Sequence, residues 1–138
     1  MPPAAAVTAL SPAAKLRLAA EILAAYARVR ATLVRRDVGA TVGALRHVAP
    51  GPPDAPPDGY EVDRLARAVV RVLRLLPTDS RCLMRSLVLT RLLARRGAPA
   101  QLVIGVTAAP GFAAHAWVEH GGRAVLPPGS GFSRLVEL

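Results

Sequence analysis

The sequence predicts an α+β fold, in which N-terminal helices precede a helix that leads into a small antiparallel sheet. Three observations support this prediction. Apolar residues recur at helical spacing as far as Gly97, they alternate at every second position after it, and a Gly-Gly pair separates two of the alternating segments. Helices that come first and strands that follow are typical of an α+β domain, because βαβ units would interleave the two.

Length and composition restrict the classes of function. The chain has 138 residues, which suits one domain, and its formal net charge of +9 favours acidic partners. It has one cysteine, so it cannot form an internal disulfide and does not need an oxidising compartment. Aromatic residues make up only 4% of the chain and no groove-reading motif is present, so we expect no nucleic-acid partner.

The longest stretch without Asp, Glu, Lys or Arg runs from Gly97 to Val118, which is long enough to span a bilayer. It contains Pro99 and Pro110 and alternates like strands, so we interpret it as buried sheet and expect no integral membrane segment. Residues 1–10 lack the basic start and apolar run of a signal peptide. We therefore expect a cytoplasmic protein.

The N-terminal part is predicted to be helical. Ser11 is an N-cap candidate with Pro12 at the first helical position, and an amphipathic pattern continues to Arg36. Asp37 can cap a shorter helix that extends towards His47.

A proline-rich segment follows these helices. Five prolines fall within residues 50–57, which excludes a helix or a central strand there and indicates a stiff connector. The expected organisation is a helical region at residues 1–49, the connector at 50–57 and the core at 58–138.

Two more helices are predicted on either side of a capping segment. The first starts near Asp58, and its apolar stripe continues until Pro77. The residues from 78 to 80, Thr-Asp-Ser, have the composition of a helix cap, so Cys82 falls at or near the first turn of the next helix. That helix ends at residues 95–97, Arg-Arg-Gly, with cations on its last turn and a glycine beyond it.

Strands are predicted for the remainder of the chain. Residues 101–107 and 114–120 form the first two, and Gly121-Gly122 is the turn signal of a hairpin. Residues 123–126 are predicted as a third strand, and residues 132–138 as an edge strand.

Cys82 is the candidate nucleophile. A lone cysteine is more often a buried structural thiol than a reactive one. Its place at a helix start argues for reactivity, because unpaired amides and the helix dipole favour the thiolate there. Arg81 and Arg85 add positive potential on either side. The N–H of Cys82 is also placed to help bind a tetrahedral oxyanion.

His115 is the candidate general base. A lone strand histidine is more often structural, but this strand belongs to the sheet that directly follows the cysteine helix, and that helix is expected to pack across the sheet. Side chains alternate along a strand, so Trp117 and Glu119 share the face of His115. Trp117 is expected in the core, and Glu119 either orients the imidazole or is solvated. His120 and His47 are assigned to the surface.

Residues 82–126 resemble the core of the lasso-peptide leader peptidases, which are transglutaminase-like (papain-like) cysteine peptidases. The family pattern is a Cys-Leu-x-Arg-Ser-Leu helix start, an Arg-Arg-Gly helix end, a Leu-Val-Ile-Gly-Val strand and a His-Ala-Trp-Val-Glu strand. All of these motifs are present, at residues 82–87, 95–97, 102–106 and 115–119.

The resemblance implies a transglutaminase-like fold with Cys82 as nucleophile and His115 as base. The family's third catalytic residue is an acid about a dozen positions after the histidine, where it orients the imidazole. Residues 125–129, around Pro127, contain no carboxylate and no amide side chain. Three explanations stay open: a bare dyad, a weakened enzyme, or an orienting acid from Glu119, Asp79 or Glu137.

The resemblance also implies substrate and partners. The reaction is removal of the leader from a lasso-peptide precursor, after which a separate cyclase joins the freed amine to a carboxylate. Residues 1–60 lack the alternating strands of a fused leader-recognition domain. We therefore infer the split form, with a separate leader-recognition protein that docks on the first helix or the basic N-terminal half.

No cofactor or metal is implied, since no His, Cys or Asp cluster has ligand spacing. Two alternatives to the peptidase remain. One is a non-hydrolytic acyl transferase of the same fold, and the other is a catalytically weak peptide-binding module.

Overall fold

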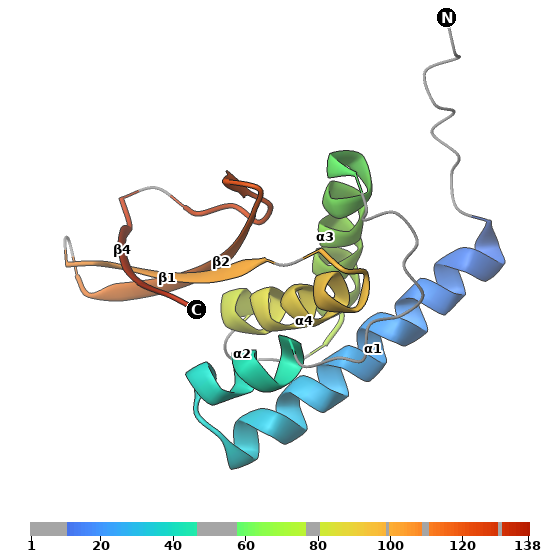
Figure 1. The fold of residues 1–138 in the computed structure, drawn as a ribbon, viewed down its shortest axis with the longest axis horizontal. Helices are drawn as coiled ribbons and strands as arrows, with labels where there is room; N and C mark the ends of the chain where they lie inside the picture. Colours follow the sequence, from blue (N-terminus) through green and yellow to red (C-terminus); the bar gives the residue numbers. More distant parts are fainter. Residues whose placement is uncertain (1–10, 47–57, 77–80, 99, 109–110, 130) are drawn as a thin grey trace, which may run out of the picture.

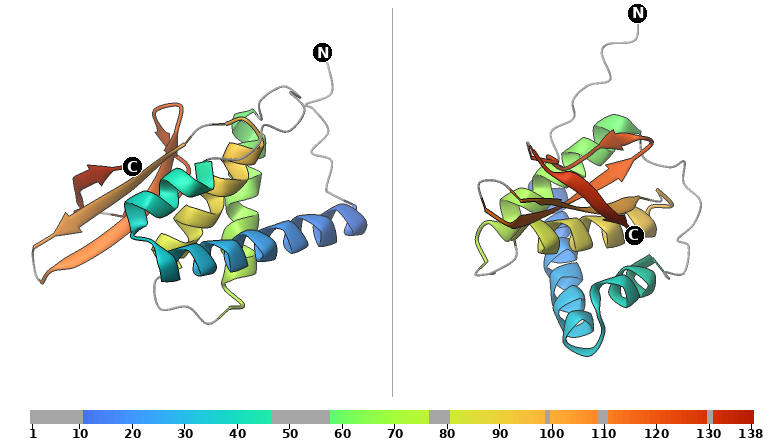
Figure 2. Two further views of the ribbon diagram at one scale, coloured as in Figure 1. Left: turned by 60° about the horizontal axis from the view of Figure 1, so that its bottom comes forward. Right: turned by 90° about the vertical axis from the view of Figure 1, so that its left-hand side faces the viewer.

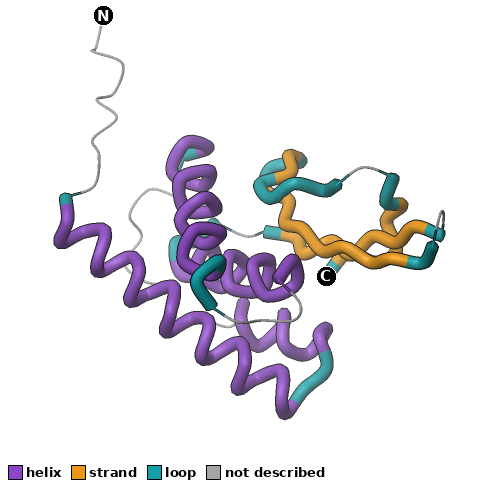
Figure 3. Tube along the Cα trace, turned by 180° about the vertical axis from the view of Figure 1, so that it is seen from behind, coloured by secondary structure: helices purple, strands orange, loops and turns teal. Residues whose placement is uncertain are grey.

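The computed structural model describes residues 11–46, 58–76, 81–98, 100–108, 111–129 and 131–138 (Figure 1). Within these residues the chain forms helices first and a small antiparallel sheet after them, which confirms the α+β fold. The elements are α1 (Pro12–Arg35), α2 (Val38–Arg46), α3 (Gly59–Leu73), α4 (Arg81–Arg95), β1 (Gln101–Thr107), β2 (Ala113–His120), β3 (Arg123–Ala124) and β4 (Ser133–Glu137). Seen from behind, helices and strands occupy separate sides of the molecule (Figure 3).

The helix starts agree with the caps expected from the sequence. The Oγ atom of Ser11 accepts a hydrogen bond from the Ala14 N–H at 3.2 Å, with Pro12 at the first helical position. Asp58 caps α3 by accepting from the Glu61 N–H at 2.8 Å. Asp37 precedes α2 and accepts from the N–H of residue 40 at 2.7 Å. Each cap satisfies an amide that has no partner within its own helix.

Helix α4 lies at the centre of the molecule. It contacts α1, α2 and α3 on one side and β2 on the other (Figures 1 and 2). A helix that is apolar around most of its circumference is typical of a buried element. Its fully buried apolar side chains are Leu87, Val88, Leu89, Leu92 and Leu93.

The N-terminal helices share one core with α4. Their buried members are Ile22, Ala25 and Val29 of α1 with Val42 and Leu45 of α2. The apolar face of α1, a candidate docking surface, is thus largely covered within the molecule. Its exposed apolar side chains are Leu16, Leu23 and Val34. No helix in the described ranges has both the length and the apolar character that a bilayer crossing requires.

The sheet has the strand order β3-β2-β1-β4, and every neighbouring pair is antiparallel. The register of β1 and β2 places Gly105 opposite His115 and Val103 opposite Trp117. The hairpin between β2 and β3 turns through Gly121 and Gly122, whose φ angles of 60° and 76° suit glycine. Strand β4 pairs with β1 and forms the predicted edge.

Two predicted elements are shorter than expected. The third strand ends at Ala124, because the Val125 and Leu126 N–H groups both point to the Val118 carbonyl oxygen, at 2.8 and 3.4 Å. This irregular pairing breaks the ladder. Helix α3 ends at Leu73, and turns with hydrogen bonds between residues three positions apart continue to Leu76. The proline-rich connector and the capping segment at 78–80 lie outside the described residues.

Candidate active site

Cys82 is the second residue of α4, in its first turn, and its side chain is half-buried. The amides of a first turn have no partners within their helix, so this end carries partial positive charge. The Cys82 carbonyl oxygen accepts a hydrogen bond from Ser86 Oγ at 2.7 Å, and Ser86 in turn accepts from Thr90 Oγ1 at 2.8 Å. These two buried hydroxyls are therefore satisfied inside α4, the helix that packs on β2.

His115 lies in β2, half-buried, and is held by a backbone atom. Its Nε2 lies 2.8 Å from the carbonyl oxygen of Pro127. A carbonyl oxygen can only accept a hydrogen bond, so Nε2 carries the hydrogen. Nδ1 has no hydrogen-bond partner among the residues that the structure describes. In its neutral form the imidazole therefore presents Nδ1 as a free acceptor, which is what a general base needs.

Aromatic rings enclose this imidazole. The ring of Trp117 stacks with it at a centroid distance of 5.9 Å, and the ring of Phe132 lies at 5.3 Å. Gly129 lets the chain pass beside the rings of Phe132 and His115, because its φ is +68° and a Cβ there would lie 3.0 Å from Phe132 and 3.5 Å from the His115 ring. Trp117 is 3% exposed, so it is a core residue, whereas the His115–Pro127 hydrogen bond itself is exposed.

Glu119 does not orient His115. One of its carboxylate oxygens accepts from Trp117 Nε1 at 3.0 Å and from Arg134 at 2.5 Å. The Trp117 hydrogen bond, and then that of Arg134, hold the pKa of Glu119 below its usual value. Glu119 thus fixes the indole next to the imidazole and joins β2 to β4.

Glu137, another acid considered for the third catalytic position, also has no contact with His115. Glu137 pairs with Arg134 at 2.7 Å, and Asp79 lies outside the described residues. The group that binds Nε2 comes instead from Pro127, twelve residues after the histidine. Side-chain chemistry could not reveal it, because every residue has a carbonyl. The available signal was the spacing, since the resemblance implies an acid at about this distance after the histidine.

The structure puts Cys82 and His115 on neighbouring elements without joining them. Both residues are described, and no hydrogen bond connects Sγ with the imidazole. Arg85, one turn after Cys82, is half-buried, and its Nε has no hydrogen-bond partner within the described residues. His120, expected at the surface, is half-buried at the end of β2, and His47 is outside the described part.

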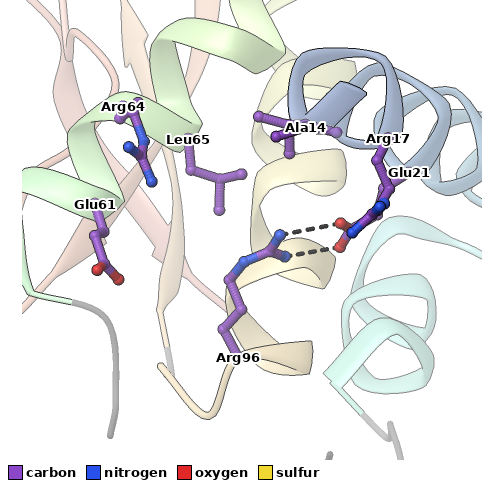
Figure 4. A pocket seen from close by; sticks show the side chains of 8 residues that line it. Ala14, Arg17, Glu21, Glu61, Arg64, Leu65 and Arg96 are labelled. Atoms are coloured by element: carbon purple, nitrogen blue, oxygen red, sulfur yellow. Dashed lines mark hydrogen bonds and ion pairs between the residues drawn. The ribbon is translucent and has the colours of Figure 1, made fainter. Parts of the chain in front are cut away.

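A hollow of about 230 Å³ lies elsewhere, between α1, α3 and the end of α4 (Figure 4). Arg96 crosses it to Glu21 through two hydrogen bonds, at 2.7 and 3.0 Å. Neither Cys82 nor His115 lines it. In the described ranges no three His, Cys, Asp or Glu side chains gather where they could hold a metal ion.

Comparison with known protein families gives a match over most of the chain. The model of a family described as the transglutaminase-like superfamily matches residues 4–136. No curated protein and no solved structure matches the chain significantly. The similarity therefore extends from the start of α1 into β4.

Proposed function

Because the chain belongs to the transglutaminase-like superfamily, we propose that it is a cysteine peptidase with Cys82 as nucleophile and His115 as general base. This superfamily consists largely of cysteine-dependent enzymes. The proposal also draws on the position of the only cysteine, half-buried in the first turn of the helix that packs on the histidine strand. A thiol there is reachable and lies at the positive end of the helix dipole.

The observation that carries the proposal is the hydrogen bond from His115 Nε2 to the Pro127 carbonyl oxygen. It occurs at the spacing where the related peptidases are expected to have their acid. A carbonyl can do the part of that acid which sets the ring direction and the tautomer. It leaves Nδ1 to exchange a proton with Sγ once the two side chains approach within about 3–4 Å.

The proposed acylation step is as follows. His115 takes the proton from Cys82, and the thiolate attacks the carbonyl carbon of the scissile peptide bond. The Cys82 N–H helps to bind the oxyanion that forms. The C–N bond then breaks as His115 gives its proton to the leaving amine, and a thioester remains on Sγ.

Hydrolysis completes the cycle. Water gives a proton to His115 as its oxygen attacks the thioester carbon. The C–S bond breaks, the carboxylate product leaves, and the sulfur regains its proton. The carboxylate product is the leader and the amine product is the core peptide, if the substrate is a lasso-peptide precursor as the motifs at residues 82–126 suggest. A separate leader-recognition protein brings the precursor, and a cyclase uses the freed amine.

The test is incubation of a lasso precursor and its recognition protein with wild-type enzyme and with single variants, followed by mass spectrometry. We expect Cys82→Ala to abolish cleavage and His115→Ala to reduce it by about 10³-fold or more. His120→Ala, in the same strand, is the matched control and should retain most activity. Continued cleavage by Cys82→Ala would show that Cys82 is not the nucleophile. A product that carries an added amine would indicate acyl transfer instead.

A further inference from the structure

A groove of about 480 Å³ lies between α3 and the segment that follows β3. Its volume is within the range of about 300–1,000 Å³ that is usual for ligand sites. One wall belongs to α3 and the other to Val125, Leu126 and Pro127. Pro127 is the residue whose carbonyl holds His115, so one end of the groove adjoins the proposed catalytic base.

The α3 wall is strongly basic. Arg67, Arg71 and Arg74 line it at helical spacing, so they project from one face of the helix end. All three are exposed, and none belongs to an ion pair formed within the described residues. The one acid in the lining, Asp63, is already paired with Arg123 at 3.0 Å. The groove thus has three cations whose charge is not balanced by its own lining.

The remainder of the lining is apolar and contains no aromatic ring. It consists of Ala66, Val70, Val125, Leu126 and Pro127. Bases of single-stranded nucleic acid need rings on which to stack, and none is offered here. An extended peptide with carboxylates and aliphatic side chains matches both the cations and the apolar floor.

We propose that this groove binds an acidic segment of the peptide substrate and leads it to the site at His115. The proposal deepens the proposed function, and it rests on that function for the identity of the ligand as substrate. Arg67, Arg71 and Arg74 bind carboxylates of the segment, and its aliphatic side chains contact Val70 and Leu126. The groove thereby selects for sequence beside the scissile bond.

Binding is measured by fluorescence anisotropy in a Cys82→Ala background, so that cleavage plays no part. The probe is a fluorescein-labelled peptide of alternating Glu and Leu, compared with the same peptide carrying Gln for Glu. The groove variant combines R67Q, R71Q and R74Q. The matched control combines R17Q, R28Q and R35Q, which remove the same charge from exposed positions of α1. Gln and Arg have similar helix propensity, and circular dichroism confirms that each variant is folded.

We expect the groove variant to weaken binding of the Glu peptide by about tenfold or more and the control by less than about twofold. The Gln peptide should bind the Cys82→Ala protein about tenfold more weakly than the Glu peptide. Equal losses in the two triple variants, or equal binding of the two peptides, would overturn the proposal. So would a single-stranded DNA oligonucleotide that binds as tightly through the same arginines. If the protein binds the Glu peptide in this way but never cleaves a precursor, the peptide-binding role of the groove stands and the proposed peptidase function is contradicted.

Discussion

At the scale of single residues, the hydrogen bond between His115 and a backbone carbonyl changes how the missing acid is understood. A neutral carbonyl is a weaker acceptor than a carboxylate, so it sets the ring direction but stabilises the imidazolium less. The proposed enzyme therefore has an oriented dyad rather than a bare one. Moderate catalytic efficiency follows, between that of a complete triad and that of a misaligned pair.

The tautomer of His115 is the first prediction. The hydrogen bond from Nε2 to the Pro127 carbonyl requires the hydrogen on Nε2 in the neutral ring. Nitrogen-15 NMR of the neutral imidazole should show a protonated Nε2 and an unprotonated Nδ1. Spectra of His115→Ala and His120→Ala assign the signals. A protonated Nδ1 would mean that Pro127 does not hold the ring.

Gly105 gives the second prediction. A Cβ at this position would lie 2.8 Å from two ring atoms of Trp117 and 3.1 Å from Cβ of Phe132. Gly105→Ala must therefore displace the rings beside His115, and we expect it to destabilise the fold by about 1–3 kcal/mol. Urea denaturation measures this change. Gly111→Ala is the control, because a Cβ there meets nothing within 4 Å. Equal stability of the two variants would contradict the close packing of Trp117 on Gly105.

The residues of the site were only partly predictable. Cys82 and His115 could be proposed from the sequence, because a thiol at a helix start and an imidazole in the sheet that follows have recognisable chemistry, and their catalytic roles stay predictions. The role of Glu119 could not be decided, because its partner Arg134 comes from a strand fifteen residues away. Pro127 could not be named, since a backbone acceptor leaves no trace in side-chain type.

At the scale of helices and strands, features that depend on neighbouring residues were predicted correctly, and features that depend on contacts between distant residues were not. Ser11 and Asp58 cap their helices as expected, because a cap depends on residues three positions apart. The third strand was predicted too long, because its end depends on how Val125 and Leu126 meet Val118 across the sheet. Such pairing depends on the whole hairpin and the two prolines after it, not on strand propensity.

The third prediction concerns the ion pair that ties α1 to the end of α4. Burial raises the pKa of Glu21, but the hydrogen bond and charge of Arg96, with Arg95, outweigh it and leave that pKa below its usual value. A carboxyl whose pKa is lowered on folding stabilises the folded state above its unfolded pKa. This contribution is lost as the pH falls through the folded pKa.

Glu21→Gln should therefore lower the free energy of unfolding by about 0.5–1 kcal/mol at pH 7. The difference from wild type should be smaller at pH 3 than at pH 7, because the contribution of a carboxyl whose pKa is lowered on folding is lost as the pH falls through that pKa. Urea denaturation at the two pH values measures this. An equal difference at both pH values would show that the variant acts through packing and not through the charge of Glu21.

At the scale of the whole molecule, the change of period after Gly97 predicted the separation of helices from sheet. It did not predict that α4 would be enclosed on both sides, since packing partners are set by the complete arrangement of apolar faces. One consequence concerns truncation. Removal of the N-terminal helices would expose buried side chains of α4, so partner docking is better probed by substitutions at exposed residues such as Leu16 and Val34.

The net charge of +9 also has a more specific meaning at this scale. Composition alone favours acidic partners but does not say where on the molecule they bind. The structure gathers Arg67, Arg71 and Arg74 along one groove wall beside the proposed base, which gives part of that charge a position and a proposed ligand. Other exposed cations, such as Arg28 and Arg35 of α1, line neither this groove nor the hollow beside Glu21.

The most direct measurement is the rate at which iodoacetamide alkylates Cys82, followed by intact mass, in wild type and in His115→Ala at neutral pH. If His115 activates the thiol, the wild type should react about tenfold faster or more, because thiolate is the reacting form. His120→Ala should react like the wild type. Indistinguishable rates for wild type and His115→Ala would contradict the account, since the reactivity of Sγ would then not depend on the imidazole of His115.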